Sequence, residues 1–486
     1  MRILVVASEA VPFVKTGGLA DVVGALPRAL ARQKHDIKVF IPRYSQFDSG
    51  RQQLKPYQWS GAVKVGCRQH TLSVEYVADR RLRLEHYFLK NDHFFSRNGL
   101  YHDEARSADY KDNDERFVFF NRGVLETVRQ LDWRPDVIHV HDWQAGLIPA
   151  YLKILFPDDP FFGGVRTVLT IHNLAFQGTF DKERFGLLGL VEEHFYPTSP
   201  FEFFGKTNFL KAGIVYADKI TAVSPRYAQE IQTAEHGCGL EGVLRERSAD
   251  LVGILNGVDY SVWSPTRDKK IPFRFHPANL SGKRMNKVEL LRELNLPSRE
   301  GTPLIGIISR LADQKGFDLL ADIADEVLGL NLQVVVLGTG ERKYHDLFTR
   351  LEQRYPDKLS ARLTFDDNLA HRIEAAADMF LMPSRFEPCG LNQMYSLKYG
   401  TVPIVREVGG LADTVTDFDP ESGQGTGFVF KEYTSAALLG AIKRAVNLYG
   451  KRRLWTKIMK SGMKRDFSWD TAARKFADLF RELVER

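Results

Sequence analysis

The chain has 486 residues, too many for one ordinary hydrophobic core, so two domains are expected. Hydrophobic residues at 44% and charged residues at 26% are ordinary for a globular protein, and a formal charge of only +6 without a concentrated basic block argues against a nucleic-acid partner. The three cysteines, Cys67, Cys238 and Cys389, lie far apart and form no C-x-x-C pair, so neither a disulfide framework nor a zinc site is expected, and a reducing cytoplasm fits best.

The beginning of the chain carries no sign of a targeting segment. Its first apolar run starts at Ile3 and is interrupted at Ser8, which is too short for the apolar region of a signal peptide. Nowhere does a stretch approach the roughly 18 apolar residues that a membrane span needs. We therefore expect a soluble, unprocessed protein with no membrane partner.

Short runs rich in Val and Ile recur along the chain, and most are followed by a helical pattern. Continuous apolar strands that alternate with helices predict an α/β fold with parallel sheets covered on both faces. Two sets of such runs predict two doubly wound domains. The first set is "RILVVASE", "DVIHVHDW", "RTVLTIHN", "KITAVSP" and "LVGILNGV", and the second is "PLIGIISR", "QVVVLGTG", "DMFLMPSR" and "VPIVREVGG".

The domain boundary is expected between residues 258 and 301, where the sequence is polar, punctuated by proline and without a strand. Within this segment "NKVELLRELNL" has the pattern of a helix. Residues 45 to 130 are the least regular part of the first half. Their charged, aromatic stretch "YHDEARSADYKDNDERF" suggests a long insertion over the open face of the first domain.

Doubly wound sheets bind ligands beyond the carboxyl ends of their strands. Several polar residues and glycines lie just past the ends of the predicted strands, where a cleft between the domains would gather them. They are Lys15, Asp142, His172, Asn256, Arg310, Lys315, Gly338, Glu387 and Gly409.

The stretch "VPFVKTGGLADV" sets a lysine and two glycines between the first strand and a helix, which indicates an anion on the backbone. It is not a P-loop, because the lysine precedes the glycines, and the missing G-x-G-x-x-G argues against a dehydrogenase. "GKT" at 205–207 lacks the first glycine of a P-loop, and "GTGERK" at 338–343 lacks the third glycine of a dinucleotide fingerprint. Gly338 and Gly340 would still let the backbone approach a ligand.

Two stretches of the second half suggest phosphate binding. In "SRLADQKG", Arg310 and Lys315 follow a strand and would reach one phosphate pair, or they are solvated surface cations. In "PSRFEPCGLNQ", Glu387 follows a strand and either meets a sugar hydroxyl or caps the turn. The following "CGLNQ" opens a helix whose free N–H groups would accept phosphate oxygens. Cys389 in it is more often a packed residue than a nucleophile.

Histidines are the remaining candidates. Alternation on a strand puts His139 and His141 on one face, but no Glu or Cys follows at ligand spacing, so a metal is not expected. Asp142, at the end of the same strand, is the better functional candidate. For His172 the sequence leaves a structural and a functional role equally open.

The assembled motifs resemble one family, the bacterial glycogen synthases and plant starch synthases. They are "KTGGLADV", "HDWQAG", "TIHNLAFQG", "ILNGVD", "SRLADQKG", "PSRFEPCGLNQMYSLKYGTVP" and "GGLADTV", in that family's order and spacing. The resemblance runs from residue 2 to "FSWDTAARKFADLFREL" at the end of the chain.

This resemblance implies a GT-B fold, in which two Rossmann-like domains face each other across a cleft. Residues 1–257 would form the acceptor side, 258–460 the nucleotide-sugar side, and 461–486 would cross back to the first domain. Such enzymes transfer glucose from ADP-glucose to the non-reducing end of an α-1,4-glucan such as glycogen, with retention at the anomeric carbon. They need no metal or other cofactor.

The resemblance also implies roles for individual residues. Arg310 and Lys315 would hold the diphosphate, and backbone N–H groups near Gly390 would add to them. The reaction would be a same-face attack in which the leaving phosphate accepts the proton of the acceptor. The other implied positions are Lys15, Gly17 and Gly18 near the distal phosphate, Glu387, Asp142, Asn256 and His172 around the glucose with Asp21 nearby, Cys389, Leu391 and Asn392 beside Gly390, and Phe365 against the adenine.

Two rival functions stay open at this point. One is a related retaining glucosyltransferase that uses UDP-glucose or a small acceptor, as a sucrose synthase does. The other is a catalytically silent glucan-binding protein, which the presence of Lys15, Arg310, Lys315 and Glu387 disfavours. The sequence leaves the oligomeric state open.

Overall fold

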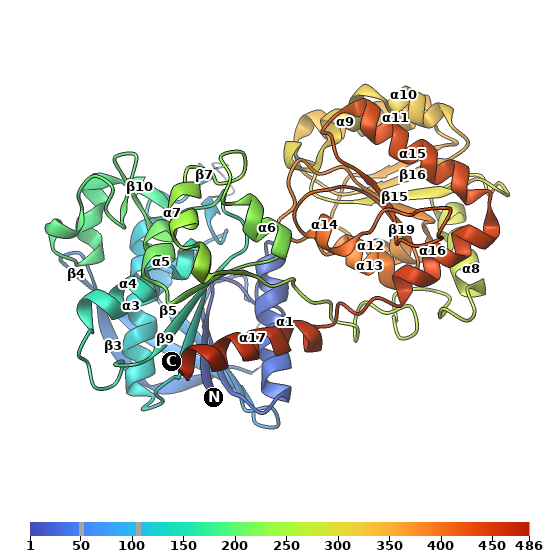
Figure 1. Cartoon of the computed structure of the whole chain (residues 1–486). Helices are drawn as coiled ribbons and strands as arrows, with labels where there is room; N and C mark the ends of the chain where they lie inside the picture. Colours follow the sequence, from blue (N-terminus) through green and yellow to red (C-terminus); the bar gives the residue numbers. More distant parts are fainter. Residues whose placement is uncertain (48–52, 104–107, 486) are drawn as a thin grey trace. The chain divides into compact units, whose positions relative to one another are not determined.

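The structure is a computed structural model that describes residues 1–47, 53–103 and 108–485 (Figure 1). It divides into two compact units, each of which has its own sheet. Unit 1 comprises Met1–Gly257 and Trp469–Arg486, and unit 2 comprises Val258–Ser468. The last helix of the chain, α17 (Trp469–Val484), therefore belongs to the first unit.

Unit 1 is built on a nine-stranded sheet with the order β14-β13-β9-β8-β1-β2-β5-β4-β3. From β14 to β5 the strands run parallel, and β4 and β3 add an antiparallel hairpin at one edge. The strands are β1 (Arg2–Val6), β2 (Asp36–Pro42), β3 (Lys55–Val65), β4 (Arg68–Asp79), β5 (Leu84–Lys90), β8 (Val137–His141), β9 (Arg166–Ile171), β13 (Lys219–Ala222) and β14 (Leu251–Gly253).

Helix α17 crosses helix α1, and the two helices pack together on this sheet (Figure 1). Val22 and Leu26 of α1 share one core with Phe476 and Phe480 of α17 and with Ile3 of β1. The apolar spacing of both helices is thus explained by burial against the sheet. The helices of unit 1 are α1 (Gly18–Arg32), α2 (Asp92–Phe95), α3 (Asn113–Gln130), α4 (Leu147–Leu155), α5 (Phe209–Tyr216), α6 (Pro225–Glu230), α7 (Glu241–Glu246) and α17, with short 3₁₀ turns η1 (Trp143–Ala145), η2 (Lys182–Leu188), η3 (Glu192–His194) and η4 (Ser248–Asp250).

Small strands complete unit 1. They are β6 (His102–Asp103) with β7 (Ala108–Asp109), and β10 (Thr179–Asp181) with β12 (Lys206–Asn208) and β11 (Glu202–Phe203).

The expectation that residues 45 to 130 form an insertion is wrong for most of its described part. Strands β3, β4 and β5 extend the main sheet, and α3 is a regular helix that packs on β3 and β5. Two neighbouring parallel strands, β2 just before this region and β5 within it, lack the apolar-run pattern because charged residues interrupt them. Lys38 of β2 stands opposite Glu85 of β5, and the two side chains form an ion pair.

Unit 2 contains a six-stranded parallel sheet with the order β17-β16-β15-β18-β19-β20. Its strands are β15 (Leu304–Ile308), β16 (Gln333–Leu337), β17 (Leu359–Arg362), β18 (Met379–Met382), β19 (Val402–Arg406) and β20 (Phe428–Phe430). Around it lie α8 (Ser281–Glu293), η5 (Asp313–Lys315), α9 (Phe317–Asp322), α10 (Ala324–Gly329), α11 (Arg342–Arg354), α12 (Asp367–Ala376), α13 (Asn392–Tyr399), α14 (Gly409–Thr414), α15 (Ser435–Tyr449) and α16 (Arg452–Met463).

Successive residues of these strands enter opposite cores. Val334 and Val336 of β16 join a core with α9, α11 and α15, whereas Val335 and Leu337 join a core with α8 and α12. Burial on both faces explains why the strands read as continuous apolar runs. All nine predicted strands are present, and the α/β prediction with parallel sheets is confirmed. Most of the predicted helix "NKVELLRELNL" lies in α8, which ends three residues before that stretch does, at Glu293.

Among the described parallel strands, each sheet has one point at which further strands begin to be added on the opposite side of the first strand. In unit 1 this place lies between β1 and β8, and in unit 2 it lies between β15 and β18. At such a switch point the loops beyond the carboxyl ends diverge and leave a crevice, which is where doubly wound sheets bind ligands.

Candidate functional site

In unit 1 the loop after β1 is organised by a buried carboxylate that the sequence did not single out. Glu9 is 3% exposed and accepts hydrogen bonds from the Thr16 backbone N–H at 2.5 Å and from the Thr16 hydroxyl at 2.6 Å. A third bond comes from the Gly17 N–H at 3.3 Å, and the Tyr101 hydroxyl donates a fourth at 2.7 Å. Glu9 therefore fixes the turn that leads from the strand into α1.

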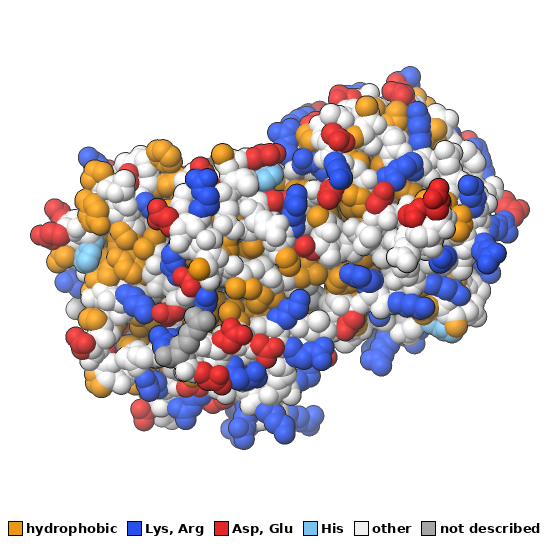
Figure 2. All heavy atoms as spheres, in the orientation of Figure 1, with side chains coloured by type: hydrophobic (Ala, Val, Ile, Leu, Met, Phe, Trp, Pro, Cys, Tyr) orange, Lys and Arg blue, Asp and Glu red, His pale blue; other side chains and the backbone are white. Residues whose placement is uncertain are grey.

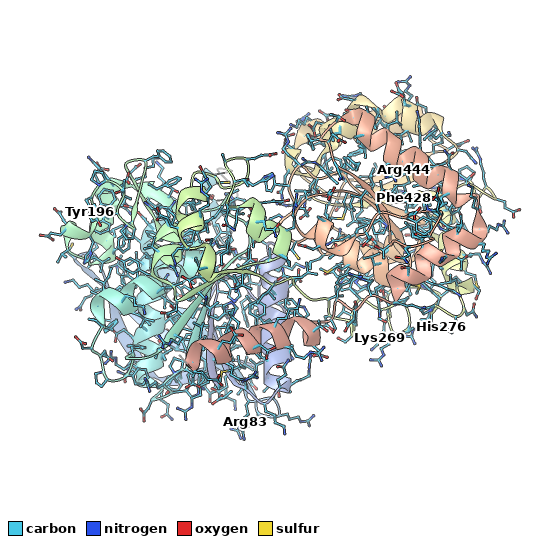
Figure 3. The ribbon with its side chains drawn as sticks, viewed as in Figure 1. Arg83, Tyr196, Lys269, His276, Phe428 and Arg444 are labelled. Atoms are coloured by element: carbon cyan, nitrogen blue, oxygen red, sulfur yellow. The ribbon has the colours of Figure 1, made fainter. Side chains whose placement is uncertain are left out.

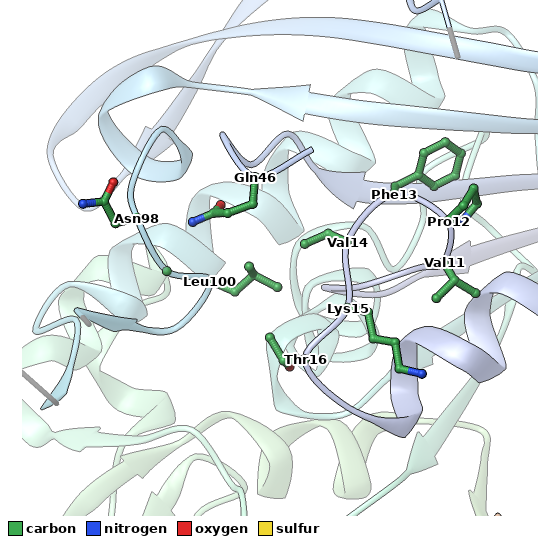
Figure 4. Close-up of a pocket in the computed structure, with 10 residues that line it drawn as sticks. Val11, Pro12, Phe13, Val14, Lys15, Thr16, Gln46, Asn98 and Leu100 are labelled. Atoms are coloured by element: carbon green, nitrogen blue, oxygen red, sulfur yellow. The ribbon is translucent and has the colours of Figure 1, made fainter. Parts of the chain in front are cut away.

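Lys15 lies on this same loop and lines a cavity of about 360 Å³ (Figure 4). Its ammonium group is 2.8 Å from the Asp21 carboxylate in the first turn of α1. A Cβ placed on Gly17 or Gly18 would meet no atom within 4 Å. The packing of the chain therefore does not require glycine at either position. A ligand that approaches the backbone closely would require it, because glycine has no side chain. The structure thus brings Lys15, Gly17, Gly18 and Asp21 together.

Asp142 and His172 meet at the ends of β8 and β9. The Asp142 carboxylate accepts the backbone N–H of His172 at 2.7 Å, and Asp142 itself has a left-handed φ of +53°. Burial raises the pKa of Asp142 to about 7, and the nearby Glu9 carboxylate adds to the rise while N–H groups of His172 and Asn173 oppose it. The charges of Glu9, after β1, and Asp142, after β8, therefore influence each other.

The His172 ring is held by a second histidine. Its Nε2 lies 2.9 Å from Nδ1 of His141, which is fully buried on β8. Burial lowers the pKa of His172 to about 3 and the pKa of His141 well below its ordinary value. Both rings are therefore neutral at physiological pH, and His172 offers hydrogen bonds rather than charge. Asn256, 7% exposed, follows β14 at the same edge of the sheet.

Unit 2 has a candidate site of its own, built around an ion pair. Lys315 Nζ lies 2.6 Å from Glu387 Oε2, and the Ser384 hydroxyl donates to the same oxygen at 3.1 Å. The side chains of Lys315 and Glu387 are 18% and 8% exposed. Lys315 ends the short turn η5 after β15, and Glu387 follows β18, so the pair spans the switch point of the sheet.

Glycines make this approach possible. Gly316 has a φ of +74°, and a Cβ there would lie 1.9 Å from the carbonyl oxygen of Pro383. Gly409 has a φ of +45°, and its Cβ would lie 1.9 Å from the carbonyl oxygen of Glu387. Only glycine fits so close to another backbone in a left-handed conformation. At Gly316 and Gly409 the absence of a side chain therefore lets the flanking loops lie directly against the segment that carries Glu387.

Helix α13 begins at the same place. Gly390 turns the chain with a φ of +68°, and the Asn392 side chain donates to the Ile308 carbonyl at the end of β15, at 2.7 Å. The first N–H groups of α13 are thereby held beside the loop that carries Arg310. Such N–H groups, together with the helix dipole, favour a phosphate.

A cavity of about 200 Å³ joins these parts of unit 2. It lies between the ends of β15 and β18. Six of the residues that the sequence proposed line it: Arg310, Lys315, Glu387, Gly390, Leu391 and Asn392.

Other proposed residues of unit 2, among them Gly409 and Gly340, lie outside this cavity lining. Cys389 is buried, and a Cβ on Gly410 would lie 2.0 Å from its carbonyl oxygen, so Cys389 belongs to the packed turn. A Cβ on Gly338 would lie 1.9 Å from the carbonyl oxygen of Ser309, so close packing of two backbones explains that glycine. Phe365 follows β17 and is 80% exposed.

Sequence reasoning missed the residues that hold others in place. Glu9 had one usable signal, because it follows the first strand directly. Tyr101 and His141 had none, since each contributes through a contact with a partner distant in the chain. Ser384 contacts a residue only three positions further on, Glu387, in the turn after β18.

No group of three or more His, Cys, Asp or Glu side chains that could hold a metal ion occurs among the residues described. Likewise, in the described part of the chain, no helix is long and apolar enough to cross a membrane.

Comparison with known proteins covers both units. The family described as starch synthase catalytic domain matches residues 2–246, and glycosyl transferases group 1 matches residues 293–461. The glycogen synthase of Anaeromyxobacter sp. (strain Fw109-5) is 49% identical over 100% of both chains. The glycogen synthase of Thermotoga maritima is 43% identical over 100% of this chain and 99% of the other.

Solved structures agree. The catalytic domain of starch synthase IV from Arabidopsis thaliana, bound to ADP and acarbose, matches with a TM-score of 0.91 and 32% identity, covering 100% of this chain and 99% of that one. Sucrose-phosphate synthase from Thermosynechococcus elongatus matches with a TM-score of 0.62 at 18% identity, covering 100% and 99%, which shows a shared fold alone. This chain therefore belongs to the family of bacterial glycogen synthases and plant starch synthases, glycosyltransferases with the GT-B fold.

Proposed function

We propose that the protein transfers glucose from ADP-glucose to the non-reducing end of an α-1,4-glucan, with retention of configuration. The observation that carries the proposal is the unit 2 cavity, which sets Arg310, Lys315 and the first N–H groups of α13 around one space. Two cations and a helix N-terminus suit a diphosphate. ADP in the related starch synthase IV structure supports this reading.

The leaving group gains negative charge as the glycosidic bond breaks, and fixed positive groups stabilise that charge most where water is scarce. Lys315 is largely buried and already oriented by Glu387 and therefore needs little reorganisation. We propose that these groups act without a metal ion or other cofactor. In the reaction, the proton of the acceptor hydroxyl passes to the departing phosphate on the same face of the sugar.

Unit 1 would supply neutral and anionic hydrogen-bonding partners for the glucose. With Nε2 engaged by His141, His172 has Nδ1 left for a sugar hydroxyl. Its low pKa makes it a hydrogen-bonding group rather than a proton donor in the imidazolium form. Lys15, on the loop fixed by Glu9, would add a third cation for the distal phosphate.

The test is incubation of the purified protein with glycogen and either ADP-glucose or UDP-glucose, with released nucleotide and labelled glucan measured, with and without EDTA. We expect transfer from ADP-glucose that EDTA leaves intact. Preference for UDP-glucose, or transfer to a small acceptor alone, would support the sucrose-synthase-like alternative. Glycogen binding without turnover would support a silent glucan-binding protein.

A further inference from the structure

Three segments of unit 1 are joined at one buried side chain, Gln177. Its amide nitrogen donates to the Cys238 carbonyl at 3.0 Å, and its amide oxygen accepts from the Asn208 side chain at 2.6 Å. Its backbone carbonyl accepts the Leu210 N–H at 3.1 Å. The loop after β9, the β11–β12 hairpin with the start of α5, and the loop before α7 are therefore fixed relative to one another.

These segments present aromatic rings to solvent. Phe176, next to Gln177, is 59% exposed, and Phe204, at the turn of the β11–β12 hairpin, is 83% exposed. The Phe203 and Phe204 rings have centroids 4.7 Å apart. A Cβ on Gly239 would lie 2.9 Å from the Phe203 ring and 3.3 Å from the Phe204 ring, so both rings lie against that loop. We call Phe176, Phe203 and Phe204 together the aromatic surface.

The exposure of Phe204 is not explained by folding. A phenyl ring in water gives up the stabilisation that burial would provide. Phe204 also has a left-handed φ of +50°, which is unfavourable for a bulky residue. A neighbour at the same turn, Gly205, has a φ of +77° without such a cost. A two-residue hairpin turn requires positive φ at both positions, so the turn accounts for the backbone of Phe204 but not for its exposed ring. The ring exposure points to a ligand of the aromatic surface.

Polar groups lie near the rings on the adjoining strands, and Phe176 belongs to the same loop after β9 as His172. Lys206 and Asp181 on the paired strands β12 and β10 are 56% and 76% exposed, with their charged atoms 3.7 Å apart. Phe176 lies four residues after His172, and its N–H bonds to the Asn173 carbonyl in a tight turn. Figure 2 shows hydrophobic side chains gathered on the visible face of unit 1 around β10 and β4.

We propose that the aromatic surface binds sugar rings of the glucan acceptor that lie beyond the unit at which transfer occurs. This inference rests on the proposed function. One face of a pyranose ring carries C–H groups that pack on aromatic rings, while its hydroxyls reach the polar groups beside them. The acceptor is a polymer that extends past His172, whereas the donor carries a single glucose. A polymer therefore needs such a surface, and the donor does not.

The experiment compares Phe176→Ala, Phe204→Ala and the double variant with wild type, using maltotriose, maltoheptaose and glycogen at saturating ADP-glucose. Tyr196→Ala is the matched control, because Tyr196 is an aromatic residue of unit 1, 54% exposed (Figure 3), with no bond to Gln177. Each ring lost from the aromatic surface should raise the KM for maltoheptaose and glycogen roughly threefold to tenfold, the worth of one aromatic contact. Turnover and the KM for ADP-glucose should stay unchanged.

The KM increase should be larger for maltoheptaose than for maltotriose, and Phe204→Tyr should restore the wild-type value. Retardation in native gels that contain glycogen measures binding without donor, and it should weaken in the same variants. An unchanged KM and unchanged retardation, or losses no larger than those of Tyr196→Ala, would overturn the proposal. So would a wild-type dimer that Phe204→Ala dissociates without change in glucan KM. A wild type that binds glycogen but transfers no glucose would contradict the proposed function instead.

Discussion

Lys315 and Glu387 form a largely buried ion pair, 2.6 Å between Nζ and Oε2, that joins the loop after β15 to the loop after β18. The cation that faces the proposed diphosphate is therefore oriented by a carboxylate beside the proposed glucose. Arg310 lines the same cavity but is exposed. The two cations consequently differ in what their loss should do.

Replacing Arg310 or Lys315 with Ala should lower turnover about a hundredfold, the cost of one preorganised electrostatic partner, with a smaller effect on the KM for ADP-glucose. Lys315→Ala should also destabilise the fold by about 2 kcal/mol, because it leaves Glu387 buried without its cation. Arg310→Ala should not. Lys315→Arg should rescue poorly, since the guanidinium differs in shape. Steady-state kinetics measure the loss of turnover, and urea unfolding measures the loss of stability. Wild-type turnover with a raised KM for ADP-glucose would show that the two residues only bind the substrate.

Gly316→Ala should destabilise the protein far more than Gly301→Ala. Both glycines have almost the same left-handed φ, +74° and +76°, so both substitutions cost about 1 to 2 kcal/mol of backbone strain. At Gly316 the new Cβ also meets the Pro383 carbonyl at 1.9 Å, whereas at Gly301 it meets nothing within 4 Å. Denaturation midpoints measure the difference. Equal shifts for the two variants would show that the close approach to Pro383 is not required.

Glu9→Gln should lower turnover at least about tenfold, a preorganisation effect, without unfolding the protein. The carboxylate accepts from Thr16, Gly17 and Tyr101, and an amide cannot accept at both of its polar atoms. The loop that carries Lys15 should therefore loosen. Kinetics on Glu9→Gln and on Glu235→Gln, whose side chain is 75% exposed, give the comparison. Wild-type turnover in the first variant would count against a positioning role.

The stability of Asp142→Asn relative to wild type should depend on pH. Burial raises the pKa of Asp142 to about 7, above the ordinary value of 3.8 that it has when unfolded. Ionisation is thus harder in the folded state, and the wild type loses stability as the pH rises from about 4 to about 7. Asn keeps the oxygen that accepts from His172 and escapes this loss. The urea midpoint of Asp142→Asn relative to wild type should therefore be higher at pH 8 than at pH 4. The exposed control Asp158→Asn should show no such change. A difference between Asp142→Asn and wild type that is the same at both pH values would contradict the raised pKa.

Phe365→Ala should weaken donor binding by about 1 to 2 kcal/mol, the worth of aromatic packing and stacking, and leave the glucan KM unchanged. The ring is 80% exposed and follows β17 in the sheet that carries Arg310, so it is available to a base. Phe365→Tyr should behave as wild type. The measurement is the KM for ADP-glucose, and an unaltered KM in Phe365→Ala would show that Phe365 does not contact the donor.

The sequence by itself determined nine of the strands, the α/β class and which polar residues lie just past strand ends. This was possible because these features are local. A strand that is buried on both faces is recognised from its own apolar run, and the position of the residue after the run follows from the end of the strand. Arg310, Lys315 and Glu387 were proposed in this way. The charged strands β2 and β5 were not, because the Lys38–Glu85 pair that permits their burial is formed between strands.

Only the tertiary structure decided which groups hold the site in shape. Glu9 acts through Thr16 and Tyr101, His141 acts through His172, and Gly316 is required because it touches Pro383. Gly338, which reads as a ligand-contacting glycine in the sequence, is explained by the Ser309 carbonyl against it. The physical reason is the same in each case. A hydrogen bond, an ion pair or a steric contact depends on the distance between two atoms, and residues far apart in the chain acquire that distance only when the strands between them pack.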